Sequence, residues 1–193
     1  MCRALRASIA LARGHLEAAS TGSEKALERA RRRKDPQILA PALTVRATVL
    51  LAQGRREEAS RLLSEALAPG SLLVTALLDL HLTATPIEFA WLVRDLGREA
   101  ELVSALESVP DTPWFEGARA IAQGNYTQAI EVVVGTGAQS VEAYARLRAA
   151  QELASAGRHA ESDEHLRAAL VFYLSVGATR YRREGEALMA ASA

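Results

Sequence analysis

The chain has 193 residues, enough for one large domain or one array of repeats. Its 23 basic and 23 acidic residues cancel, so no overall positive field exists to attract nucleic acid or an anionic membrane. The single cysteine, Cys2, excludes an internal disulfide, and no apolar run is long enough to span a membrane. We therefore expect a protein of the reducing cytoplasm that has no cofactor and no nucleic-acid or membrane partner.

The first stretch, MCRALRASIALARG, combines three arginines with a short apolar run, as a signal peptide also does. Arg6 and Ser8 interrupt that run, and the stretch fits the first helix of a repeat instead. Met1 lies almost inside this helix, which is expected of a repeat array that belongs to a longer protein.

The segment 46–67, RATVLLAQGRREEASRLLSEAL, has the pattern of two short helices joined at Gly54. After the glycine, apolar residues recur with the spacing of one helix face: Ala59, Leu63, Ala66 and Leu67. A hairpin of this size cannot bury its apolar face alone. We therefore expect it to stack on neighbouring hairpins.

Weaker copies of this pattern align on five glycines: Gly14, Gly54, Gly97, Gly124 and Gly157. Seven residues before each glycine stands a small residue: Ala7, Ala47, Ala90, Gly117 and Ala150. The residues five and nine positions after each glycine are mostly small and apolar, respectively. A small residue at position −7 would allow the two helices of a hairpin to approach closely.

Several residues mark the predicted helix ends. Asp35, Thr85 and Thr112 each precede a proline and predict N-caps, and Glu88 completes a capping box with Thr85. Asn125 with Gln128 forms a second box, and Gly22 is expected to weaken the second helix by roughly 1 kcal/mol. The expected helices are 3–13, 15–34, 37–53, 55–67, 71–83, 86–96, 98–108, 113–123, 126–134, 139–156, 158–176 and 178–191.

The predicted fold is therefore all-α, a right-handed stack of antiparallel helical hairpins with about twelve helices. The whole chain, 1–193, is expected to form one domain. Its hairpins lie near 3–34, 37–67, 86–108, 113–134 and 139–176, and the helix 178–191 caps the C-terminal end. The repeat register between residues 70 and 86 stays open at this stage.

The spacing of the small residues and of the Ala-Leu pairs around Gly54 and Gly157 resembles the tetratricopeptide (TPR) repeat. A TPR-like α-solenoid is what this resemblance implies. The last third of the chain, with Val176-Gly177-Ala178-Thr179-Arg180, looks like the C-terminal helical-repeat tail of large bacterial signalling proteins. These proteins carry a nucleotide cyclase or DNA-binding domain followed by an ATPase module. The likeness implies a regulatory tail and carries over no catalytic residue.

No motif indicates catalysis. The four histidines, His15, His81, His159 and His165, do not pair at helical spacing, and no phosphate-binding loop is present. In stacked hairpins the first helices line the concave face. The candidate partner-binding residues on that face are Thr44, Thr48, Trp91, Trp114, Tyr144 and Gln151.

The favoured function is a protein-binding or regulatory scaffold without catalytic activity, whose partner is a separate protein or another domain of the same polypeptide. The main alternative is a small-ligand sensor with an apolar pocket between hairpins. An enzyme on a helical scaffold and a nucleic-acid binder are the remaining hypotheses. Nothing in the sequence indicates an oligomeric state.

Overall fold

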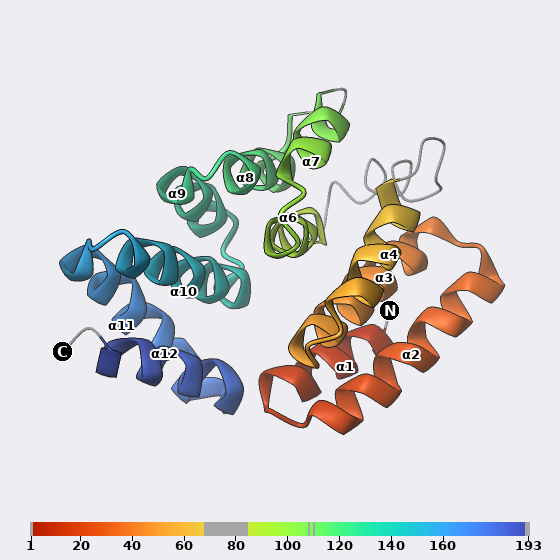
Figure 1. Cartoon of the computed structure of the whole chain (residues 1–193), viewed down its shortest axis with the longest axis horizontal. Coiled ribbons are helices and arrows are strands. Elements are labelled where there is room, and N and C mark those ends of the chain that lie inside the picture. The colour runs from red at the N-terminus through yellow and green to blue at the C-terminus, as the bar shows by residue number, and fades with distance from the viewer. Residues whose placement is uncertain (1, 68–84, 108, 110, 192–193) are drawn as a thin grey trace.

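The computed structural model describes residues 2–67, 85–107, 109 and 111–191 of the chain. All regular structure in these residues is helical, which confirms the all-α prediction (Figure 1). The helices are α1 (Cys2–Ala12), α2 (Leu16–Arg33), α3 (Pro36–Ala52), α4 (Arg56–Leu67), α6 (Thr85–Asp95), α7 (Glu99–Leu106), α8 (Pro113–Ala122), α9 (Tyr126–Thr136), α10 (Gln139–Ser155), α11 (His159–Val176) and α12 (Thr179–Ala191). The helix expected over 71–83, and with it the open repeat register, lies outside the described residues.

The five repeat glycines form the turns between the paired helices. All five have positive φ angles, between 72° and 80°, a conformation that glycine adopts without strain. In each turn the residue after the glycine donates its amide hydrogen to the carbonyl five residues earlier in the chain, for example Arg55 N to Leu50 O at 2.9 Å. This hydrogen bond is the Schellman ending of a helix, and it closes every hairpin in the same way.

The positions aligned by the repeat are buried in every copy. At −7, +5 and +9 all fifteen residues face the interior, including Gly117, Ser23 and Ser162. The hydroxyl of Ser162 satisfies its hydrogen bond by donating to Ala150 O at 2.8 Å, across the hairpin. Small side chains at these contacts let the paired helices lie close together.

Most predicted helix starts are confirmed. Asp35 accepts a hydrogen bond from Gln37 N, Thr112 from Phe115 N, and Asn125 from Gln128 N. By contrast, the end expected for α9 at residue 134 is wrong, because the helix continues through Gly135 to Thr136. Gly137, with φ of 71°, ends it instead.

Helix α2 runs without interruption through Gly22. A Cβ added at this glycine would lie 3.4 Å from the Cβ of Ala7. This is an ordinary van der Waals distance, so α1 and α2 lie in contact there, and the glycine lowers the helix propensity of α2 without breaking the helix.

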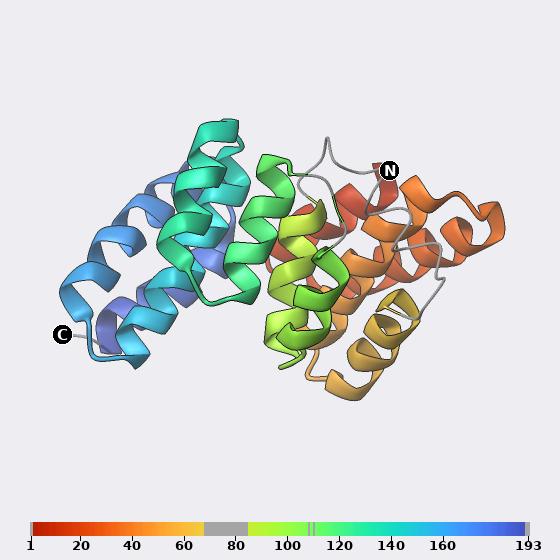
Figure 2. The ribbon, with the colours of Figure 1, turned by 90° about the horizontal axis from the view of Figure 1, so that it is seen from above.

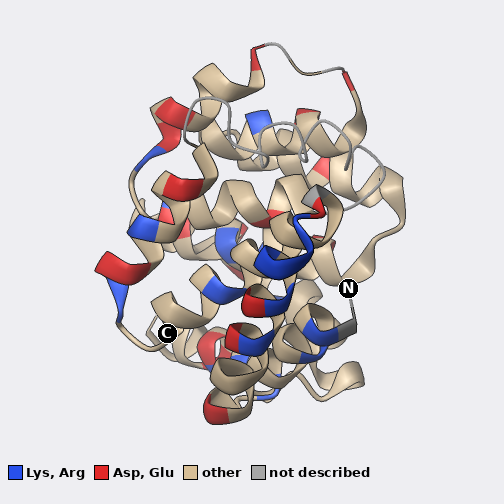
Figure 3. Ribbon diagram, turned by 90° about the vertical axis from the view of Figure 1, so that its right-hand side faces the viewer, with Lys and Arg blue, Asp and Glu red and all other residues tan. Residues whose placement is uncertain are grey.

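Successive helices pack on one another along the chain, and the array curves back on itself. α12 contacts α1, so the last described helix reaches the first (Figures 1 and 2). Two arginines connect neighbouring units. The buried Arg46 on α3 donates to Ser20 O on α2 at 3.2 Å, and the partly exposed Arg98 donates to Ser64 Oγ on α4 at 2.9 Å. Acidic and basic residues are interspersed over the face shown in Figure 3.

Candidate binding cavity

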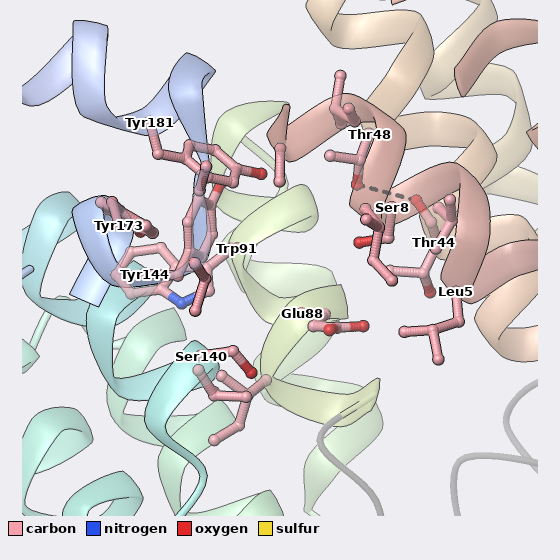
Figure 4. Close-up of a pocket in the computed structure, with 18 of the residues that line it drawn as sticks. Leu5, Ser8, Thr44, Thr48, Glu88, Trp91, Ser140, Tyr144, Tyr173 and Tyr181 are labelled. Atoms are coloured by element: carbon pink, nitrogen blue, oxygen red, sulfur yellow. Dashed lines mark hydrogen bonds between the residues drawn. The ribbon is translucent and has the colours of Figure 1, made fainter. Parts of the chain in front are cut away.

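The curved array forms a partly open cavity of about 420 Å³. Six helices supply its described walls, namely α1, α3, α6, α10, α11 and α12. Figure 4 shows α1 and α3 on one side of it and α10 and α12 on the other, with α6 between them. The described lining residues are Leu5, Ser8, Ile9, Leu11, Ala12, Arg13, Thr44, Val45, Thr48, Ile87, Glu88, Trp91, Leu92, Asp95, Ser140, Val141, Tyr144, Phe172, Tyr173, Val176, Ala178 and Tyr181.

Each helix presents one face to the cavity. On α6 the lining residues are spaced i, i+3, i+4 and i+7: Glu88, Trp91, Leu92 and Asp95. On α1 the same spacing selects Leu5, Ser8, Ile9 and Ala12. The side chains of Leu5 and Ile9 are 60% and 44% exposed, which makes the α1 side of the cavity apolar and open to a ligand.

Tyrosines form the opposite wall. The ring centroid of Tyr181 lies 5.4 Å from that of Tyr144 and 5.2 Å from that of Tyr173. Burial raises the pKa of Tyr144 to about 12 and raises the pKa of Tyr173 and Tyr181 as well. The three phenols are therefore neutral at physiological pH, and the buried hydroxyl of Tyr173 has no hydrogen-bond partner among the described residues.

Trp91 is held in place from behind the cavity. Its ring stacks on Tyr126 at 5.7 Å between centroids, and the guanidinium of Arg148 lies 5.4 Å from its centroid. Arg148 also pairs with Asp95, the second acid of the α6 face. Burial raises the pKa of Asp95, and the charge of Arg148 opposes that shift. Asp95 is thus occupied by a partner from α10.

Glu88 differs from Asp95 in this respect. Its carboxylate points from α6 into the space towards α1 and α3 (Figure 4). Among the described residues it makes no hydrogen bond or ion pair, and burial alone raises its pKa to about 7. Its side chain keeps exposed surface where it faces the cavity. The capping box expected between Glu88 and Thr85 stays a prediction, because the residue before Thr85 lies outside the described residues.

The structure brings four of the six candidate residues to this cavity. Thr44, Thr48, Trp91 and Tyr144 line it, and both threonine hydroxyls donate to α3 carbonyls, Thr44 to Ala40 O at 3.0 Å and Thr48 to Thr44 O at 2.9 Å. Trp114 on α8 packs against the core, and neither it nor Gln151 is among the described lining residues. The role of all six in binding stays a prediction.

Sequence reasoning missed several lining residues. The sequence pattern places Glu88 at a helix cap and does not single out Tyr173 or Tyr181, because it does not position their helices relative to α1. The one signal in the sequence is the spacing of Glu88, Trp91 and Asp95, which places these three residues on one helix face. No comparable signal points to Tyr173 or Tyr181.

The described residues contain no group of three or more His, Cys, Asp or Glu side chains suited to a metal ion. Their helices also include none with the length and hydropathy that a membrane span requires. Of the four histidines, His15 and His159 are exposed. Nδ1 of His165 lies 3.4 Å from Nη1 of Arg146. His81 is outside the described residues.

The cavity is therefore the feature from which a function can be inferred. Its walls are apolar and aromatic, and a few polar groups converge on it, which is typical of small-molecule sites. No protein-family model, curated protein or solved structure matches this chain.

Proposed function

We propose that this chain is a binding module that holds a small ligand in the cavity between its first and last helices. One observation carries the proposal: a cavity of about 420 Å³ whose apolar and aromatic wall holds a carboxylate, Glu88, without a partner among the described residues. Pockets of this size enclose most of the surface of a metabolite-sized molecule. Because the cavity lies between α1 and α12, a ligand that contacts both helices would also link the first helix of the array to the last.

The proposal includes the architecture expected from the sequence. We regard the hairpins as a right-handed TPR-like α-solenoid whose concave face forms the cavity. The resemblance to the helical tails of bacterial signalling proteins supports a regulatory role, in which ligand binding stiffens the curved array. In that context the sensor would act in the cytoplasm on other domains of its own polypeptide.

A thermal-shift screen of cellular metabolites tests the ligand proposal. A ligand at 100 times its Kd adds about 2.7 kcal/mol to the free energy of unfolding, which raises the Tm of a domain of this size by about 5–10 °C. The variant Ser8→Phe places a phenyl ring in the cavity and should abolish the shift. Ser104→Phe, an exposed position on α7, is the matched control and should preserve it. A ligand that stabilises Ser8→Phe as well as the wild type would refute binding in the cavity.

A protein partner is the second candidate function, and a different surface favours it. Val171 and Leu174 lie one helical turn apart on α11 and are 70% and 59% exposed. Two exposed apolar side chains on one face indicate a contact surface. The double variant Val171→Asp with Leu174→Asp should lose any partner that the wild type retains from a lysate of its own organism, without losing the ligand shift. Unchanged retention would refute this surface.

A further inference from the structure

The charged side chains that line the cavity differ in whether they have a partner of opposite charge. Three charged side chains line it within the described residues, namely Arg13, Glu88 and Asp95. Asp95 is neutralised by Arg148, and Arg13 is exposed in the turn directly after α1. No charged neighbour contributes to the pKa shift of Glu88, so Arg13 does not compensate it. Glu88 is therefore the acid of the cavity without a partner in the described part of the chain.

Aromatic side chains accompany this carboxylate. Tyr144 and Tyr181 are only partly buried and face the cavity, and Trp91 follows Glu88 on the same face of α6 (Figure 4). Burial is the main cause that raises the pKa of Tyr181, and the negative charge of Glu88 adds to it. The carboxylate and the tyrosine both line this cavity. Electron-rich ring faces attract cations, most strongly where water is excluded.

The remaining wall determines the rest of the ligand. Leu5 and Ile9 on α1 and Val176 on α11 are exposed apolar side chains at the cavity. The hydroxyls of Thr44 and Thr48 already donate to helix carbonyls, so neither of these two hydroxyl hydrogens is free for an anionic ligand. An apolar body beside one positive charge fits these walls, whereas an anion would lie next to an unpaired carboxylate.

We propose that the cavity takes an organic cation, a molecule with an apolar body and one protonated or quaternary nitrogen. The nitrogen pairs with Glu88 and lies near the rings of Tyr144 and Tyr181, and the apolar body lies against Leu5 and Ile9. This inference rests on the proposed ligand-binding function and specifies the class of its ligand.

The test uses three probes with the same apolar body and different charge: 4-phenylbutylamine, 4-phenylbutan-1-ol and 4-phenylbutanoate. Calorimetric titration of the full chain near pH 8, where Glu88 is ionised and the amine is protonated, measures each Kd. We expect the amine to bind at least about tenfold more tightly than the alcohol, and the carboxylate more weakly than both. Glu88→Gln should remove the preference for the amine, and Glu131→Gln, an exposed position on α9, should preserve it.

A pH series on the wild-type chain gives a second readout that does not depend on a variant. The affinity for the amine should increase as pH rises through about 7, because Glu88 ionises there, while the alcohol should show no such increase. Among the described residues, Asp95, Arg13 and the tyrosines are the other titratable groups facing this space, and the loss of the pH dependence in Glu88→Gln would assign it to Glu88.

The outcomes separate the two proposals. Equal affinity for amine and alcohol, both abolished by Ser8→Phe, would overturn the cation preference and leave the ligand-binding function standing. No binding of any probe up to millimolar concentration, together with a metabolite that binds in the screen, would overturn the cation preference as well. No binding of probes or metabolites would overturn both.

Discussion

Replacement of Gly117 by alanine tests the close helix packing on which the whole array depends. A Cβ added at this position would lie 2.8 Å from Ile87 Cδ1 and 3.7 Å from Val132 Cγ1. Ile87 has no exposed surface, so its neighbours resist the movement that would relieve the contact. The added methyl group therefore has to separate α8 from α6 or force Ile87 out of its preferred rotamer.

Two opposing terms set the size of the effect. Alanine inside a helix stabilises that helix by about 0.8–1.0 kcal/mol relative to glycine. An extra methyl group in a packed core costs about 1–3 kcal/mol. Gly135 provides the matched control, since it also lies inside a helix, α9, but has no atom within 4 Å of an added Cβ. Gly135→Ala receives the helix term alone, so the difference between the two variants isolates the packing cost.

Urea denaturation followed by circular dichroism measures this difference. We expect Gly135→Ala to be more stable than the wild type and Gly117→Ala to be less stable than Gly135→Ala by about 1–3 kcal/mol. A difference of 2 kcal/mol corresponds to a Tm difference of about 4–8 °C in a chain of this length. Equal stabilisation of the two variants would refute the close approach of α8 and α6.

Three further predictions concern other parts of the array. Because the folded-state pKa of Glu88 is about 7 and its unfolded value is near 4.5, the stability that protonated Glu88 contributes is present below about pH 4.5 and lost as pH rises through 7. Glu88→Gln should therefore gain about 1 kcal/mol relative to wild type between pH 5 and 8, after allowance for solvent screening, and a pH-independent difference in Tm would contradict this. Ala59→Glu places a charge at a fully buried contact and should cost several kcal/mol in urea denaturation, whereas the exposed control Ala100→Glu should change little; similar losses would disprove the repeat alignment. Ser162→Ala removes the hydrogen bond to Ala150 O and should lower the free energy of unfolding by about 1 kcal/mol, and an unchanged value would show that this bond contributes nothing.

The hairpins could be predicted from sequence because each depends on local signals. The glycine marks the turn, as Gly54 shows. The small residues seven positions before it and five positions after it, here Ala47 and Ala59, mark the buried faces of the two helices. The misplaced end of α9 has a local cause too. Glycine commonly ends a helix, and Gly135 and Gly137 both follow residue 134; the positive φ of Gly137 marks the one that ends α9.

The cavity could not be predicted in the same way, because it depends on the curvature summed over the whole array. The contact of α12 with α1 brings Tyr181 close to a helix far away in sequence. Local spacing places Glu88 equally well at a helix cap or on a helix face. Only the position of α6 between α1 and α10 shows that its carboxylate has no partner in the described residues and faces a cavity.

The central claim is that a ligand occupies the cavity, and nuclear Overhauser contacts between 4-phenylbutylamine and the labelled chain test it most directly. We predict contacts from the phenyl protons to the methyl groups of Leu5 and Ile9 and from the methylene next to nitrogen to the rings of Tyr144 and Tyr181. Contacts to Val171 and Leu174 on the outer face of α11, with none to the cavity residues, would contradict the account.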